Sequence, residues 1–179
     1  MFDKLKIAFV LVAIGAISGI TIYTVNILTK DTIAQNIIEK EQSFYKELFY
    51  LDEDTEVSFE SIDLEDEAVA QEVIVYDAQG DFLGYIYKGI DQNNYGEVVV
   101  LIGVTLDGEI SNVVISSTTN TPNFAKIIEK KYLSPFGSQN VDNISIDSST
   151  GATYTYTSVV KIVENAATYF LENRGELHD

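Results

Sequence analysis

The chain has 179 residues, with 11 Lys and Arg against 28 Asp and Glu, a formal net charge of −17, no cysteine and one histidine. This acidity excludes nucleic-acid binding, which depends on clustered positive charge. Without cysteine the chain cannot hold a thiolate-ligated iron–sulfur cluster, a covalent c-type haem or a disulfide. His178 lies near the end of the sequence, where we expect disorder, so a histidine-based triad or zinc site is not expected. Any redox chemistry must therefore come from a bound organic cofactor.

An uncharged apolar run extends from Ile7 to Leu28, with Lys4 and Lys6 before it and Lys30 after it. As a helix it would be roughly 33 Å long, enough to cross the hydrocarbon core of a bilayer. A cleaved signal peptide is the alternative, but its apolar segment is usually about 7–15 residues, and no convincing cleavage site follows here. We therefore expect an uncleaved single-pass anchor in the cell membrane. Because Lys4 and Lys6 favour a cytoplasmic N-terminus, we expect the rest of the chain on the extracytoplasmic side.

Two segments follow the span. Residues 31–50 place Ile33, Ile37 and Leu48 at helical spacing, which predicts a juxtamembrane amphipathic helix. Residues 51–67 hold nine acids and no base. Because their spacing fits no EF-hand calcium loop, we interpret this acidic stretch as a solvated loop or linker.

Strand-like runs come next, separated by residues typical of hairpin turns. The runs are Glu72–Asp77, Phe82–Gly89, Gly96–Leu106 and Ile110–Ser117, with turns at 78–81 and 107–108. They predict an antiparallel meander. Helical periodicity then predicts a short helix over about Asn123–Tyr132 and a longer one over Val159–Leu171. The expected fold class is α+β: a single N-terminal transmembrane helix followed by one extracytoplasmic domain with an antiparallel sheet and flanking helices.

The most informative stretch is residues 147–153, Asp-Ser-Ser-Thr-Gly-Ala-Thr. Its last residue, Thr153, precedes the predicted C-terminal helix. The N-terminus of a helix offers unpaired N–H groups and a positive dipole end, so a phosphate ester on Thr153 would be stabilised there. The Ser, Thr and Gly residues of this stretch have a simpler explanation by composition alone, since these residues are common in turns and at N-caps. In that case Thr155, Thr157 or Ser158 would cap the helix.

This heptad resembles a known motif. Asp147, Thr150, Gly151, Ala152 and Thr153 match the flavinylation motif of the FMN-binding domain found in the G-type subunit of the Rnf complex and the C-type subunit of the Nqr complex. In that family the last Thr of the motif carries FMN through a phosphoester bond. The resemblance extends over roughly residues 72–171, because the order and spacing of the preceding elements also agree.

Those elements are a Gly-containing segment, two strands around an Asp-Gly turn, and a Glu-Thr-Pro-Gly-Leu-Gly loop ahead of a short helix. The matching residues here are 95–100, 103–104, 106–110 and 120–125. In the last loop Thr121 and Pro122 are kept, whereas Asn120 replaces the acid, and Asn123 and Ala125 replace two glycines. Asn tolerates a left-handed backbone, but Ala lacks the freedom of Gly. The shape of the flavin pocket and the flavin's potential are thus free to differ from the family's.

The resemblance implies an electron-carrying subunit of a membrane ion-translocating oxidoreductase of Rnf type. Such a complex passes electrons between ferredoxin and NAD and pumps Na⁺ or H⁺. The chain would divide into residues 1–30 (cytoplasmic N-terminus and transmembrane anchor), 31–71 (juxtamembrane helix and acidic connector) and 72–179 (FMN-binding domain). The implied cofactor is covalent FMN on Thr153, with Asp147, Thr150, Gly151, Ala152, Thr121 and Pro122 beside it, no catalytic side chain and no metal.

The partners implied are a separate FMN transferase using FAD and magnesium, other membrane and iron–sulfur subunits, and the lipid bilayer. The equivalent position in an Nqr complex is less favoured, because the C-type protein of Nqr is usually longer. Two further alternatives are a free-standing membrane-anchored FMN electron-transfer protein and a cofactor-free tethered module for binding or scaffolding. The last predicts no covalent adduct.

Overall fold

The computed structural model describes residues 2–66, 68–145 and 153–174. Helix α1 runs without interruption over Phe2–Leu48, so the predicted membrane span and juxtamembrane helix form one element. The chain splits into two compact units, Met1–Glu41 and Gln42–Asp179. In the first unit the helix is long and apolar enough to cross a membrane, a property that signal sequences share. The hydroxyls of Thr21 and Thr24 donate to carbonyls one turn back, so they need no other partner in an apolar environment.

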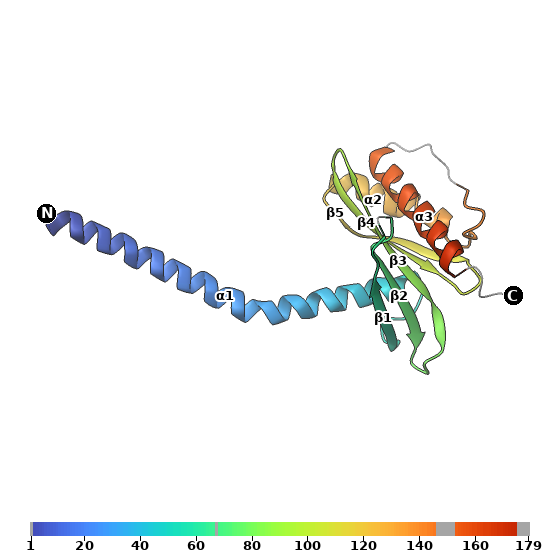
Figure 1. Cartoon of the computed structure of the whole chain (residues 1–179), viewed down its shortest axis with the longest axis horizontal. Helices are drawn as coiled ribbons and strands as arrows, with labels where there is room; N and C mark the ends of the chain where they lie inside the picture. Colours follow the sequence, from blue (N-terminus) through green and yellow to red (C-terminus); the bar gives the residue numbers. More distant parts are fainter. Residues whose placement is uncertain (1, 67, 146–152, 175–179) are drawn as a thin grey trace. The chain divides into compact units, whose positions relative to one another are not determined.

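The second unit is built on a five-stranded antiparallel sheet in the order β1-β2-β3-β4-β5 (Figure 1). The strands are β1 (Val57–Asp63), β2 (Gln71–Asp77), β3 (Phe82–Asn93), β4 (Gly96–Val104) and β5 (Ile110–Thr118). The helices of this unit are α2 (Pro122–Lys131), a 3₁₀ turn η1 (Ser134–Phe136) and α3 (Thr153–Asn173). The predicted meander, the short helix and the α+β fold class are confirmed.

Strand β1 corrects the interpretation of the acidic stretch as a loop or linker, which is wrong for Val57–Asp63. The strand forms because Phe59 pairs with Val75 and lies edge-on to Tyr45, with the ring centroids 5.3 Å apart. Glu60 and the other polar residues of β1 are exposed at the edge of the sheet. Charges on an edge strand hinder pairing with other chains, so acidity and strand formation are compatible.

The two faces of the sheet are covered by different helices. Tyr85, Tyr87 and Ile102 belong to the larger core cluster, which includes residues of α2, η1 and α3, and these helices lie over one face (Figure 1). Ile86 and Leu101, their neighbours in sequence, belong to the smaller cluster with Tyr45 and Leu48 of α1. This alternation is what a strand requires when both of its faces are covered.

Helix α3 begins earlier than the apolar periodicity predicts. It starts at Thr153, so Thr155, Thr157 and Ser158 all lie inside the helix, and the expectation that one of them caps it is wrong. Thr155 and Ser158 are buried. The middle of the helix rests directly on strand β3: a Cβ on Gly89 would come within 2.2 Å of Ile162 Cγ2. This close approach fixes where the first turn of α3 stands over the sheet.

Candidate functional site

Three segments far apart in sequence meet at the start of α3. They are the β3–β4 turn around residues 93–96, the loop of residues 118–122 between β5 and α2, and the first turns of α3. We call this place the α3-start site. Each segment is joined to the others by hydrogen bonds that involve their side chains.

The turn and the loop are joined at Glu97. The N–H of Thr119 and the hydroxyl of Thr118 both donate to the Glu97 carbonyl, at 3.0 and 2.9 Å. The Glu97 N–H in turn donates to Thr119 Oγ1 at 2.8 Å. Gly96 permits this contact, because it has a φ of 136° and a Cβ there would lie 2.2 Å from Thr119 Oγ1. The loop is thereby held against the turn.

The loop and the turn are each tied to α3. Asn120 Nδ2 donates to Thr155 Oγ1 at 2.9 Å, and Asn93 Nδ2 donates to Ser158 Oγ at 2.9 Å. Ser158 then donates to Asp91 Oδ2 at 2.7 Å, and Lys161 forms an ion pair of 2.6 Å with the same carboxylate. Burial alone would raise the pKa of Asp91, but the hydrogen bonds from Lys161 and Ser158 outweigh it and lower that pKa. These hydrogen bonds connect the start of α3 to the sheet. We call the residues that form them, Asn93, Asn120, Thr155, Ser158 and Asp91, the polar frame.

Comparison with known proteins connects this frame to a family. Residues 94–168 match the family model of the FMN-binding domain. This part of the chain is therefore similar to FMN-binding domains. The match begins in the β3–β4 turn and ends within α3, so it contains the β5–α2 loop, the predicted motif and the start of the helix.

No curated protein matches the chain. Among solved structures, the chain is similar to NqrC of Shewanella oneidensis, with a TM-score of 0.45 and 16% sequence identity. That similarity covers 58% of this chain and 61% of NqrC, so the chain spans less than two thirds of that protein.

Within the matched residues 94–168 the sequence-predicted residues fall into two groups. Thr153 is the first residue of α3, Thr121 directly precedes α2, and Pro122 is the first residue of α2. The Asn120–Thr155 hydrogen bond brings the start of α2 and the start of α3 together, and Thr121 and Pro122 are both exposed there. The other predicted residues, Asp147, Thr150, Gly151 and Ala152, lie outside the described residues.

Asn120 plays a part that the sequence did not reveal. Its side chain is buried, with 3% of the residue exposed, and its Oδ1 atom has no hydrogen-bond partner among the described residues. A buried acceptor without a partner costs about 1–3 kcal/mol, so such atoms are rare unless a bound group completes them. An unpaired acceptor within the part that matches the FMN-binding family fits a cofactor whose ring system carries an N–H donor.

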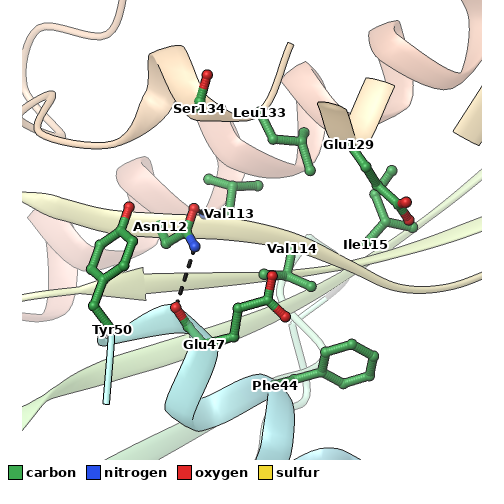
Figure 2. Close-up of a pocket in the computed structure, with 10 residues that line it drawn as sticks. All are labelled: Phe44, Glu47, Tyr50, Asn112, Val113, Val114, Ile115, Glu129, Leu133 and Ser134. Carbon is green, nitrogen blue, oxygen red and sulfur yellow. Dashed lines mark hydrogen bonds between the residues drawn. The ribbon is translucent and has the colours of Figure 1, made fainter. Parts of the chain in front are cut away.

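A hollow of about 440 Å³ lies elsewhere, along β5, between the last turn of α1 and the α2–η1 segment (Figure 2). Asn112 at its wall donates to the backbone carbonyl of Glu47 at 3.3 Å. Glu47 and Glu129 give it two carboxylates, and the described residues that line it include no base. Neither Thr121 nor Pro122 borders it. Two carboxylates disfavour a phosphate, so the α3-start site is the better candidate for FMN.

Proposed function

We propose that the domain carries FMN in phosphoester linkage to Thr153 and serves as an electron-carrying subunit of an ion-translocating oxidoreductase of Rnf type. The observation that carries this proposal is the family match over residues 94–168, within which Thr153 begins a long helix. The N-terminal helix would anchor the protein in the cell membrane, with the FMN-binding domain on the extracytoplasmic side.

The position of Thr153 suits a phosphate ester. Helix α3 has 21 residues and no acidic residue in its first turn, so the positive end of its dipole is not offset there. A separate FMN transferase would place the FMN phosphate of FAD on the Thr153 hydroxyl, with loss of the hydroxyl proton and release of AMP. Asp147, Thr150, Gly151 and Ala152 would be the residues that the transferase recognises.

When bound, FMN supplies one- and two-electron transfer, and the protein supplies position and polarity. The frame around Asn120, Thr155 and Ser158 would hold the attachment residue in place relative to the loop of Thr121 and Pro122. A covalent bond also prevents loss of the cofactor from a domain outside the cell. No side chain of the chain is assigned acid–base catalysis.

Attachment is tested by intact mass of the full chain co-expressed with an FMN transferase. We expect a mass increase equal to FMN minus water, which maps to the peptide containing residues 147–153. Thr153→Ala should abolish the increase and Thr153→Ser should retain it. Thr157→Ala is the matched control, since Thr157 is exposed on the same helix, one turn later. Absence of the adduct, with the transferase active on a control substrate, would favour the cofactor-free tethered module.

Membrane orientation can be tested by labelling an introduced cysteine. Because the chain has no cysteine of its own, the label reports only the introduced position. A single cysteine is introduced either as Lys4→Cys, before the span, or as Gln79→Cys in the exposed β2–β3 turn. Intact cells are treated with a maleimide that cannot cross the membrane. We expect only Gln79→Cys to be labelled, and the reverse pattern would contradict the proposed orientation.

Membership of a complex is tested by purifying the full chain from its native membrane under mild conditions. We expect membrane and iron–sulfur subunits to co-purify with it. A flavinylated protein that purifies alone would instead support the free-standing electron-transfer protein.

A further inference from the structure

Two exposed tyrosine rings contact each other beside the proposed attachment residue. Tyr95 lies in the β3–β4 turn, and Tyr154 follows Thr153 in the first turn of α3. Their ring centroids are 5.2 Å apart in an edge-to-face arrangement. Yet 60% of Tyr95 and 52% of Tyr154 remain exposed. The pair therefore presents aromatic surface to solvent at the α3-start site.

Local structure does not require aromatic side chains at these positions. Small and polar residues are the usual choice in a two-residue hairpin loop, and tyrosine has no special preference for the first turn of a helix. The contact between the rings stabilises the pair, but it leaves about half of each residue in water. A ligand that covered the rings would remove this apolar surface from water.

The hydrogen bonds described above hold the backbone that carries both rings. The Tyr95 N–H donates to Asn93 Oδ1 at 2.9 Å, and Asn93 is itself bonded to Ser158 of α3. Tyr154 is followed by Thr155, which is buried and bonded to Asn120. A surface with fixed backbone on both sides loses little entropy when a ligand binds to it.

An unpaired polar atom lies next to the pair. Asn120 Oδ1, buried and without a partner among the described residues, is 3.1 Å from where a Cβ on Gly96 would stand. Gly96 is the neighbour of Tyr95 in the turn. The site thus combines two exposed aromatic rings with an acceptor that lacks a donor, a combination suited to a planar heteroaromatic group with an N–H.

We propose that the Tyr95–Tyr154 pair is the surface on which the isoalloxazine ring of the attached FMN rests. This inference depends on the proposed attachment at Thr153, because the flexible ribityl chain would then lead from the residue next to Tyr154. Tyrosine is electron-rich and the flavin ring electron-poor, so their contact is favourable. The residues of the larger core cluster are buried against one another, and the hollow along β5 has two carboxylates among its lining residues and borders neither Thr121 nor Pro122, so the Tyr95–Tyr154 pair is the better surface for the ring.

The test uses the flavinylated full chain and its Tyr95→Leu and Tyr154→Leu variants. Tyrosine in contact with a flavin quenches its fluorescence by donating an electron to the excited ring. We expect the intact protein to be severalfold less fluorescent than the same flavin on a proteolytic peptide. Each variant should recover much of that fluorescence while keeping the full adduct mass. Tyr50→Leu is the control, since Tyr50 is 74% exposed but borders the hollow along β5.

Mass and fluorescence separate the possible failures. A full adduct with fluorescence unchanged in both variants would overturn the role of the pair and leave the attachment to Thr153 standing. A wild-type chain without adduct would overturn the attachment itself. An adduct that forms on the wild type but not on the two variants would assign the rings to binding of the transferase, which also overturns this inference.

Discussion

The two ends of α3 are fastened to the sheet by different chemistry. Beyond its C-terminal end, Arg174 donates to both carboxylate oxygens of Glu72, at 2.9 and 3.2 Å, and lies over the ring of Tyr85. The Tyr87 hydroxyl completes this cluster with a hydrogen bond of 3.1 Å to Glu72. At the N-terminal end the contacts to α3 are mostly between amides and hydroxyls, as in the Asn120–Thr155 bond.

The clusters also differ in how fully their groups are paired. Burial is the main cause that raises the pKa of Tyr87 far above its usual range, and the negative charge of nearby Glu72 is the next. The Tyr87 hydroxyl therefore keeps the proton it donates. Hydrogen bonding to Glu72 likewise raises the pKa of Arg174. The Arg174–Glu72 cluster thus has a donor for each carboxylate oxygen, whereas the start of α3 has an acceptor without a donor among the described residues and two exposed rings. We infer that the first end maintains the fold and the second is arranged for a ligand.

The largest expected effect comes from removing the cation of the Arg174–Glu72 cluster. Arg174→Met leaves the Glu72 carboxylate buried with the Tyr87 hydroxyl as its one side-chain partner among the described residues, which should lower the free energy of unfolding by about 3 kcal/mol. Denaturant unfolding of the full chain in detergent measures this. Glu172→Gln, a charge change at an exposed position near the same end, is the control. FMN attachment should survive in both variants. Equal stability of the two would contradict the anchoring role of Arg174.

A glycine substitution at the other end should have a smaller effect on stability and a clear one on function. Gly96→Ala combines a φ of 136° with a clash against Thr119 Oγ1, so we expect a loss of about 2 kcal/mol and slower FMN attachment. Gly80→Ala is the matched control, because Gly80 has a φ of 84° but a Cβ there would meet no described atom within 4 Å. Rates of adduct formation followed by intact mass should fall only for Gly96→Ala. A similar fall for Gly80→Ala would mean that backbone strain alone is responsible.

Much of the fold follows from local sequence patterns. The alternation and turn residues predicted β2 to β5, and the helical spacing around Ile127 and Ile128 predicted α2. Strand β1 was missed because Val57 and Phe59 stand among acids and serines, and their burial depends on packing against β2 and α1. The start of α3 was missed because its first turns are rich in threonine and tyrosine rather than periodic in aliphatic residues.

The candidate site was predictable only where it is local in sequence. Thr153 was found because the motif 147–153 is a contiguous stretch. Asn120 was visible as a departure from the family loop, but its bond to Thr155 joins residues 35 apart, and the rings of Tyr95 and Tyr154 are still further apart in sequence. Such pairings arise when the hairpin and the loop fold onto α3, so no local pattern contains them.

A smaller effect on stability is expected when Asn120 is changed. Asn120→Ala removes the hydrogen bond to Thr155, worth about 1 kcal/mol, but it also removes the unpaired Oδ1, so the two changes offset each other. We expect stability without FMN to change by less than about 1 kcal/mol. The gain in melting temperature on FMN attachment should be smaller than in the wild type. Thr157→Ala, which leaves the frame intact, should keep the full gain, and an unchanged gain in Asn120→Ala would argue against Asn120 as a ligand contact.

The smallest effect concerns pH and the ion pair of Asp91. Because the pKa of Asp91 is lowered in the folded chain, its stabilising contribution is fully present above the unfolded pKa of about 3.9. As pH falls from that value through the lower pKa of the folded chain, the unfolded chain takes up a proton first, and the contribution is progressively lost. Unfolding measured from neutral to acidic pH should therefore show the wild type more stable than Asp91→Asn at neutral pH, with the difference shrinking below about pH 4. The Lys161 side chain is 62% exposed, so solvent screens the pair and the difference should be modest. A difference that persists unchanged at acidic pH would mean that Asp91 acts through the Ser158 hydrogen bond rather than through its charge. Glu72, at the other end of α3, would then be the main source of charge-dependent stability.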